Sequence, residues 1–432
     1  ITVRGTLIEG NAEFGMCVIG AQASLDGSVI RDTQADAEGW WGRGLYVDVD
    51  SDSGASSQVA IARSLFERNA EIGLYVNGSS LLVEGSVVRD TQLDGAGMFG
   101  FGVAVVAEPL VSTRSDLTVR GSLLDANHSI GVYIEGSDGI VDSTVVRDTA
   151  LNGQGKFGYG IDLQPDPVTG ERAQGSIVGC LVELNHSTQI GVIGSDATLV
   201  ATAVRDALPS SLGHGGQGIN VLPNPTTDAP SSLAISSCLV ERSHEGAIVV
   251  ASSDVTIDAT VLRETSSDSA GKFGRTLVLA GYPGVAWPST ATLSSCLIED
   301  SVEAAVSSFG GHLDIDFSLI RNTQPNLNGH YGDGVLLIRD LASGSATLRG
   351  TLIENSARAA ISSFGASISL TGLRLSCQSF DLAGEVAAVD GHDFLFDDLG
   401  GNACGCGPQL ASCKVLSANL SPPDPLEPEH DL

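Results

Sequence analysis

Arginine recurs along the chain at a fixed step of 58 residues. The series contains Arg31, Arg89, Arg147, Arg205, Arg263 and Arg321. An acidic series lies between them and contains Glu9, Glu67, Asp125, Glu183, Glu241, Glu299 and Glu354. The two series alternate at steps of 22 and 36 residues, and the last step is 33. A self-similar period of this length indicates a solenoid, in which each repeat unit packs on its neighbours.

Each repeat unit has the composition of short strands. Runs rich in valine, isoleucine, leucine and threonine are separated by turn dipeptides such as Asn-Gly, Gly-Ser and Asp-Gly, and no helical period extends over ten residues. We therefore predict an all-β solenoid of about 13 coils over residues 1–376, folded as one domain with short and long coils alternating. The chain begins inside a repeat, so we expect a cap upstream of Ile1.

The residue before each of these charges is apolar, and we assign this series to the core. It contains Ile8, Ile30, Phe66, Val88, Leu124, Val146, Val182, Val204, Val240, Leu262, Ile298, Ile320 and Ile353. Side chains alternate along a strand, so the small residues two positions earlier also point inward, among them Cys180, Cys238 and Cys296. Glutamate and arginine then alternate on an outer face, where opposite charges on neighbouring coils favour one register.

A second apolar series lies one residue before the core series. It contains Leu7, Val29, Leu65, Val87, Leu123, Val145, Leu181, Leu239, Val261, Leu297, Leu319 and Leu352. If the strand bends here, both series enter the core. In a straight strand this stripe faces outward and needs a cover, which predicts lateral self-association or docking to another surface protein.

The longer step inserts about a dozen residues with a glycine-aromatic motif, as in Gly39-Trp40-Trp41-Gly42 and Gly97-Met98-Phe99-Gly100. We expect these long loops on one side of the solenoid, in every second coil. Their aromatic residues are candidates for a sugar-stacking strip: Trp40, Trp41, Phe99, Phe157, Tyr159, Phe273 and Tyr331. The alternative is that each ring only closes its loop onto the solenoid.

The coil sequence resembles a known family. The residues that carry the resemblance are Asn11 followed by Gly15-Met16-Cys17-Val18, and Asn69 followed by Gly73-Leu74-Tyr75-Val76. With them the sequence is similar to the coil of right-handed parallel β-helix proteins of the pectate-lyase-like superfamily. The resemblance covers residues 1–376 and implies the fold. It leaves function open, because that superfamily contains lyases, hydrolases, epimerases, tailspikes, adhesins and non-catalytic surface proteins.

Catalytic motifs of these enzymes are not assembled in the sequence. A polysaccharide lyase needs a basic residue and a means of neutralising a uronate, yet the chain has three lysines and its arginines follow the repeat. Of the pectin-hydrolase motifs, Gly213-His214-Gly215 and Asp397-Asp398 occur in reverse order, and Arg-x-Lys does not occur. We predict a non-catalytic structural or binding module, and the alternative is a polysaccharide lyase or glycoside hydrolase.

Two residue groups suggest metals. Asp48, Asp50 and Asp52 resemble the start of a calcium loop, although Val59 occupies the position of its last glutamate. His128, His186 and His244 share one repeat position, but residues two coils apart are about 9.6 Å from each other, too far to share one ion. Calcium at the three aspartates is therefore the metal we consider.

Residues 377–432 depart from the repeat and form a predicted cap with a proline-rich tail. Cys377, Cys404, Cys406 and Cys413 lie in it, and four cysteines allow three pairings. A bridge between Cys404 and Cys406 is strained, which leaves two pairings, both tying Cys377 to the cap. Two disulfides predict an oxidising, extracellular or cell-surface location.

The net charge of −30 argues against nucleic acid and anionic membranes as partners, since both select basic surfaces. No run of about 18 apolar residues that would span a membrane is present in the sequence. The partners that we expect are a polysaccharide or another surface protein. Anionic sugars are disfavoured unless divalent cations bridge them to the chain.

Overall fold

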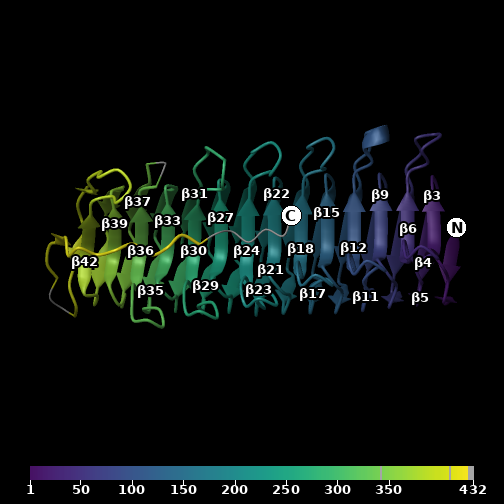
Figure 1. Ribbon diagram of the computed structural model, residues 1–432, viewed down its shortest axis with the longest axis horizontal. Helices are drawn as coiled ribbons and strands as arrows, with labels where there is room; N and C mark the ends of the chain where they lie inside the picture. The colour runs from purple at the N-terminus through teal and green to yellow at the C-terminus, as the bar shows by residue number, and fades with distance from the viewer. Residues whose placement is uncertain (341–342, 408–409, 427–432) are drawn as a thin grey trace. The chain divides into compact units, whose positions relative to one another are not determined.

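The computed structural model describes residues 1–340, 343–407 and 410–426. They belong to two compact units: unit 1 is Ile1–Leu212 with Asn224–Ala229, and unit 2 is Gly213–Pro223 with the described part of Pro230–His430. Strands follow one another in a fixed order of three, each joining a different parallel sheet (Figure 1). Within the described residues each of the three sets has fifteen strands. This is the parallel β-helix that the sequence predicts.

In unit 1 the first sheet contains β1 (Thr2–Arg4), β4 (Gln22–Asp26), β7 (Gln58–Ala62), β10 (Ser80–Glu84), β13 (Asp116–Arg120), β16 (Asp138–Asp142), β19 (Gln174–Val178) and β22 (Asp196–Val200). The second contains β2 (Leu7–Glu9), β5 (Val29–Arg31), β8 (Leu65–Glu67), β11 (Val87–Arg89), β14 (Leu123–Asp125), β17 (Val145–Arg147), β20 (Leu181–Glu183) and β23 (Ala203–Arg205). The third contains β3 (Phe14–Ile19), β6 (Arg43–Asp48), β9 (Ile72–Asn77), β12 (Phe101–Val106), β15 (Ile130–Glu135), β18 (Tyr159–Gln164) and β21 (Thr188–Ile193). A short 3₁₀ helix, η1 (Pro109–Val111), follows β12.

In unit 2 the first sheet contains β25 (Ser232–Ser236), β28 (Asp254–Asp258), β31 (Thr290–Ser294), β34 (His312–Asp316), β37 (Ser345–Arg349), β40 (Ser367–Thr371) and β43 (Leu395–Asp398). The second contains β26 (Leu239–Glu241), β29 (Val261–Arg263), β32 (Leu297–Glu299), β35 (Leu319–Arg321), β38 (Leu352–Glu354), β41 (Arg374–Ser376) and β44 (Ala403–Cys404). The third contains β24 (Gln217–Leu222), β27 (Gly246–Ala251), β30 (Arg275–Ala280), β33 (Ala304–Phe309), β36 (Asp333–Ile338), β39 (Ala359–Phe364), β42 (Phe380–Glu385) and β45 (Val415–Leu416).

The core follows the predicted apolar series. The middle residue of each second-sheet strand is buried from Ile30 to Ile353, and Ile8, on the first coil, is half-buried. Cys180, Cys238 and Cys296 are buried as predicted. Every residue of the core series stacks in register on the equivalent residues of the neighbouring coils, because parallel pairing sets like positions about 4.8 Å apart.

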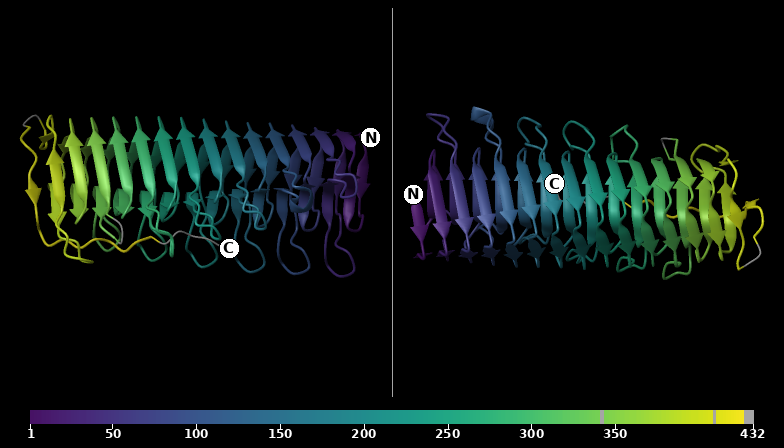
Figure 2. Two further views of the ribbon diagram at one scale, coloured as in Figure 1. Left: turned by 90° about the horizontal axis from the view of Figure 1, so that it is seen from above. Right: turned by 180° about the vertical axis from the view of Figure 1, so that it is seen from behind.

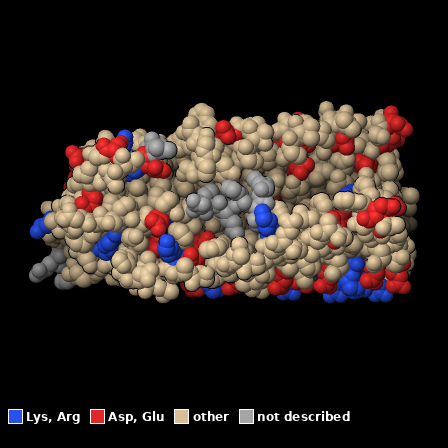
Figure 3. All heavy atoms as spheres, in the orientation of Figure 1, with Lys and Arg blue, Asp and Glu red and all other residues tan. Residues whose placement is uncertain are grey.

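The alternating charges also pair as predicted. In unit 1, Glu9 pairs in register with Arg31 and Asp125 with Arg147. Their closest nitrogen and oxygen atoms lie 2.7 and 2.8 Å apart. In unit 2, Glu241 lies 2.6 Å from Arg263. Figure 3 shows the blue and red atoms side by side along the lower edge, over β5 and β11. The second sheet therefore carries a self-neutralised outer face.

The long coils differ from the expectation in one respect: they carry two long loops. The connection from β5 to β6 spans residues 32–42, and the connection from β6 to β7 spans residues 49–57. In the next, short coil these corners are residues 68–71 and 78–79. The insertion is thus divided between both ends of the third-sheet strand, and Figure 2 shows the loops of unit 1 emerging in rows.

The second apolar series is neither fully buried nor fully exposed. Its residues are half-buried, except Leu7, which is exposed. The strand therefore does not turn this position into the core, and it does not leave a fully exposed apolar strip either. Self-association through the stripe stays a prediction.

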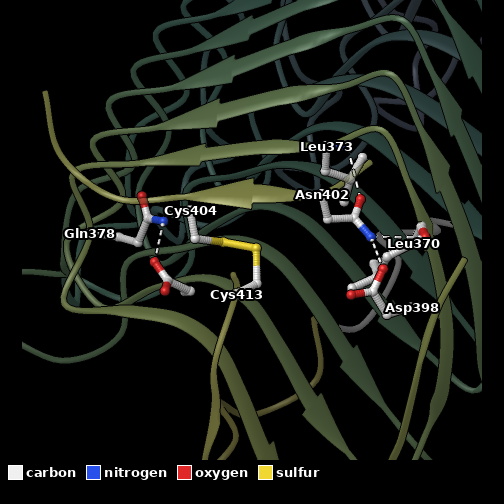
Figure 4. Close-up of a disulfide and its surroundings, with 8 residues drawn as sticks. Leu370, Leu373, Gln378, Asp398, Asn402, Cys404 and Cys413 are labelled. Atoms are coloured by element: carbon white, nitrogen blue, oxygen red, sulfur yellow. Dashed lines mark hydrogen bonds between the residues drawn. A yellow bond between two sulfur atoms is a disulfide. The ribbon is translucent and has the colours of Figure 1, made fainter. Parts of the chain in front are cut away.

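The C-terminal segment contains two disulfides, Cys377–Cys406 and Cys404–Cys413. This is one of the two pairings that the sequence left open. Asn402 lies beside the second bridge, where it accepts a hydrogen bond from the Leu373 amide and donates to the Leu370 carbonyl (Figure 4). The bridges and this asparagine hold β44 against β41.

We predict that Arg147→Glu lowers the free energy of unfolding by about 1 kcal/mol in dilute buffer, because it places like charges beside Asp125 and Glu183. In 1 M NaCl the loss should shrink, since screening shortens the reach of these charges. Urea unfolding at the two salt concentrations measures this. Lys414→Glu is the control, because it alters the net charge of the chain by the same amount at an exposed residue outside the ladder. An equal loss for Arg147→Glu at both salt concentrations contradicts the charge ladder.

Candidate functional site

The outer face of the third sheet in unit 1 is the strongest candidate for a binding surface. The long loops adjoin it at both ends of its strands, and its outward side chains form three columns. The first column begins with Phe14 and Arg43, and the second with Cys17 and Tyr46. The third contains Asp48, Asn77 and, further along, Glu135. Aromatic, cationic and acidic groups therefore lie side by side on one face.

Aromatic rings of this face contact one another. The rings of Tyr46 and Tyr75 stack, with their centroids 5.6 Å apart and an interplanar angle of 8°. The Trp41 ring lies 5.8 Å from that of Phe14. Phe101 lies 5.5 Å from both Phe99 and Tyr133, and the rings of Phe157 and Tyr159 are 5.9 Å apart. The loop aromatics thus fold onto the sheet.

The loop aromatics hold a backbone conformation that glycine adopts more easily. Trp41, Phe99 and Phe157 have φ values of 64°, 57° and 61°. A residue with a side chain loses about 1–2 kcal/mol in this left-handed region. At the same repeat position in unit 2, Gly215 has a φ of 75°, and Phe273 and Tyr331 have values of 64° and 68°. Strained conformations concentrate where the side chain itself is needed, and here the ring offsets the strain through its contacts with the sheet.

Arg43 organises the N-terminal part of the face. Its guanidinium donates to both carboxylate oxygens of Glu71, at 3.0 and 2.9 Å, and both side chains are largely buried. The guanidinium carbon lies 3.9 Å from the ring centre of Tyr75 and 4.5 Å from that of Trp41. The arginine therefore fixes the ring planes by cation–π contacts. Burial raises the pKa of Tyr75 to about 12, so its hydroxyl stays protonated at neutral pH.

Carboxyl groups line the third column and the end of the second. The Tyr133 hydroxyl donates to Glu135 at 2.6 Å, and Gln164 donates to Asp162 at 2.8 Å. Burial raises the pKa of Glu135, and the nearby Asp166 adds to this, although the Tyr133 hydrogen bond lowers it. Burial also raises the pKa of Asp162, to about 7, and its Oδ1 has no hydrogen-bond partner.

The equivalent face of unit 2 is covered by the chain itself. Residues 417–426, which we call the C-terminal strap, cross it (Figure 1). Glu385 accepts hydrogen bonds from the amides of Ala418 and Leu420. Further along, Arg275 donates to the Asp424 carbonyl at 2.7 Å, and Leu426 is buried against the outward-facing Val249 and Val278. The strap thus fills the surface that is open in unit 1.

The predicted aromatic strip is accordingly divided. In unit 1, Trp40 is 56% exposed, Trp41 39% and Phe99 38%, whereas Tyr159 is buried. In unit 2, Phe273 packs against the cluster under Leu426. Tyr331 lies beneath the guanidinium of Arg358. The rings both close their loops and, in unit 1, present an accessible aromatic surface.

The predicted calcium loop is not brought together as a metal site. Asp48 accepts hydrogen bonds from Tyr46 and Asn77. Asp50 instead accepts from the amides of Asp52 and Ser53, within its own turn. Among the described residues, the one set of His, Cys, Asp and Glu with converging ligand atoms is His214, Glu245 and Asp268. This set was not predicted from the sequence. The signal that could have indicated it is Gly215, which occupies the position of the aromatic residue in the other long loops.

No protein-family model matches the sequence, and a comparison with curated proteins finds no match. Solved structures with a similar fold include a periplasmic alginate epimerase, at 7% identity and a TM-score of 0.44, with 88% of this chain and 78% of that chain covered. The receptor binding domain of the siphovirus 9NA tailspike matches at 10% identity and a TM-score of 0.41, with 95% of this chain and 75% of that chain covered. The catalytic unit of a GH87 α-1,3-glucanase from Streptomyces thermodiastaticus matches at 13% identity and a TM-score of 0.38, with 97% of this chain and 65% of that chain covered. At these identities the likeness concerns the fold alone.

Asp162→Asn should remove a pH dependence of stability. The carboxyl has a higher pKa in the folded chain, about 7, than the value near 3.9 of an unfolded chain. The folded state therefore binds the extra proton, and stability from this group is greatest at low pH, falls as pH rises from about 4 to 7, and is level above that. Urea unfolding between pH 4.5 and 7.5 should show wild type losing roughly 1 kcal/mol per pH unit relative to the variant. Parallel pH profiles of the two proteins contradict this account of Asp162.

Proposed function

We propose that this chain is a secreted, glycan-binding β-helix that holds a neutral polysaccharide on the outer face of the third sheet in unit 1. The observation that carries the proposal is the row of loop aromatics held at positive φ and laid onto this face. Aromatic rings offer flat apolar surfaces with polar groups at their edges, which suits the apolar face and hydroxyl rim of a sugar ring.

The charges of the face favour neutral sugars. Its principal cation, Arg43, is already neutralised by Glu71, and Asp48 and Glu135 add negative charge and hydrogen-bond acceptors. A uronate polymer would meet repulsion here, whereas sugar hydroxyls donate hydrogen bonds to carboxylates. The net charge of −30 supports the same choice.

The C-terminal segment supports a role outside the cytoplasm. Two disulfides, Cys377–Cys406 and Cys404–Cys413, persist in oxidising compartments and are rare in the cytosol. No helix among the described residues has the length and apolar character to cross a membrane. The disulfides support secretion or display at a cell surface, where polysaccharides are available as ligands.

Phe99→Ala is expected to weaken binding to the neutral glycan that ranks highest on a glycan array by roughly 10-fold, about the 1–3 kcal/mol that an aromatic contact contributes in stacked complexes. Affinity electrophoresis in a gel containing that glycan measures the change. Phe317→Ala is the matched control, because this phenylalanine is 72% exposed and lies after β34, at another corner of the coil. Equal retardation of both variants and wild type contradicts the assignment of the face.

The second candidate is a carbohydrate-active enzyme on the same surface. The observation in its favour is that Glu135 and Asp162, two carboxyls of raised pKa, lie on the adjacent strands β15 and β18, as an acid and base pair would. Full burial of Asp162 weighs against it. Release of reducing ends from the bound glycan, abolished by Glu135→Gln, would establish hydrolysis. Glycan binding without any release of reducing ends supports the binding module instead.

A further inference from the structure

One buried acidic residue lacks the arginine that partners its repeat equivalents. In two places an arginine of a long coil binds a buried glutamate of the following coil, 28 residues later: Arg43 binds Glu71 at 3.0 and 2.9 Å, and Arg275 binds Glu303 at 3.1 and 2.8 Å. Glu245 occupies the same position and is equally buried. The residue 28 positions before it is Gln217, which carries no charge.

The other long coils avoid this imbalance. Where an aromatic residue takes the arginine position, as Phe101 and Tyr159 do, the glutamate position holds a serine, Ser129 or Ser187. The coil with the pair Asp333 and Arg358 reverses the charges but keeps the ion pair. Among these six pairs in the described chain, Gln217 and Glu245 form the one pair in which an acidic residue lacks an arginine at the partner position.

The surroundings of Glu245 add further negative charge. In the coil of Glu303, the residue 23 positions later is Asn326, whose amide donates to Glu303 at 2.9 Å. The equivalent residue for Glu245 is Asp268, a second buried carboxylate. His214 Nδ1 lies 3.6 Å from Glu245 Oε1, and the ligand atoms of His214, Glu245 and Asp268 all lie within 4.8 Å of one another.

A buried amide also remains unsatisfied at this point. The Gln217 side chain faces Glu245, is fully buried, and makes no hydrogen bond of normal geometry through Nε2 or Oε1. Two buried carboxylates and an unbonded amide are costly without a cation. His214, whose side chain is 63% exposed, leaves a path from solvent to the cluster.

We propose that His214, Glu245 and Asp268 bind a divalent transition-metal ion of the zinc type, with Gln217 Oε1 as a neighbouring oxygen ligand. The 3.6 Å between His214 and Glu245 is close to the roughly 3.4 Å that separates two ligands of tetrahedral zinc at 2.0–2.1 Å. The imidazole favours zinc over calcium or magnesium, which take oxygen ligands. Asp268 Oδ1 accepts the Lys272 amide, so Oδ2 is the oxygen available to the metal.

The ion takes the place of two contacts that this coil lacks. It supplies the positive charge that Arg43 and Arg275 supply elsewhere. It also ties down the loop before β24, in which Gly215 replaces the aromatic residue that clamps the other long loops. The site is separate from the aromatic face of unit 1 and does not depend on the glycan proposal.

Titration of the chelator-treated full chain, free of any histidine tag, with ZnCl₂ in a calorimeter tests the proposal. We expect one zinc ion per chain at this site, affinity lowered at least about 10-fold by His214→Ala or Glu245→Gln, and no competition from CaCl₂. His330→Ala is the matched control, because His330 holds the same loop position as His214, while Arg358, paired with Asp333, takes the place of Glu245 in the following coil. Zinc binding that is absent, or that falls equally in the His330 variant, overturns the site.

Gln217→Arg tests the same idea without removing a ligand. It supplies the arginine found beside Glu71 and Glu303, so the variant should lose zinc binding while its metal-free melting temperature equals or exceeds that of wild type. A melting temperature that zinc raises in wild type and not in this variant supports the proposal. Wild-type zinc affinity in Gln217→Arg contradicts it.

Discussion

Parallel stacking of coils is the constraint on which the other features depend. Every strand pairs in register with equivalent strands of neighbouring coils, so each side chain meets its repeat equivalent about 4.8 Å away. Identical charges at that spacing would repel. Alternating glutamate with arginine resolves this, and it makes the repeat 58 residues long instead of one coil long. Because coils then alternate in kind, one of every two is free to carry long loops.

The second and third sheets of the coil consequently have different roles. The second sheet is neutralised by its own charges, as in the contact of Glu67 with Arg89 at 2.8 Å. The third sheet adjoins both rows of loops and carries the aromatic rings. In unit 2 the C-terminal strap covers that surface, with Arg275, Arg358 and Glu385 holding its backbone. In unit 1 this surface is uncovered, and the loop aromatics Trp40 and Phe99 present exposed rings beside it.

The repeat made much of the fold predictable. Ile30, Arg31 and their equivalents could be assigned to core and surface, because a period of 58 residues aligns them without any tertiary information. The sequence did not decide whether the stripe that contains Leu65 and Val87 is buried or exposed, because a shift of one residue along a strand moves a side chain from the core to solvent. The strap was missed because residues 417–426 have no repeat equivalent. Its contacts with Arg275 join residues about 150 positions apart in the sequence.

The sites were less predictable than the fold. The aromatic positions follow from the glycine motif, but their placement on the third sheet depends on the loop conformation at Trp41 and Phe99. The convergence of His214, Glu245 and Asp268 joins three separate turns, and the signal in the sequence was a departure from the repeat: glycine in place of an aromatic residue and glutamine in place of arginine. Departures of this kind identify sites in a repetitive chain better than the residues that repeat.

The most direct test of the account is hydrogen–deuterium exchange, measured with and without the highest-ranking neutral oligosaccharide from a glycan array. The account predicts that ligand slows exchange in the loops and strands of the aromatic face, at residues 39–48, 97–106 and 155–164, and leaves the first and second sheets of unit 1 unchanged. Protection confined to the first or second sheet, or protection of unit 2 without unit 1, would contradict the claim that the third-sheet face of unit 1 is the binding surface.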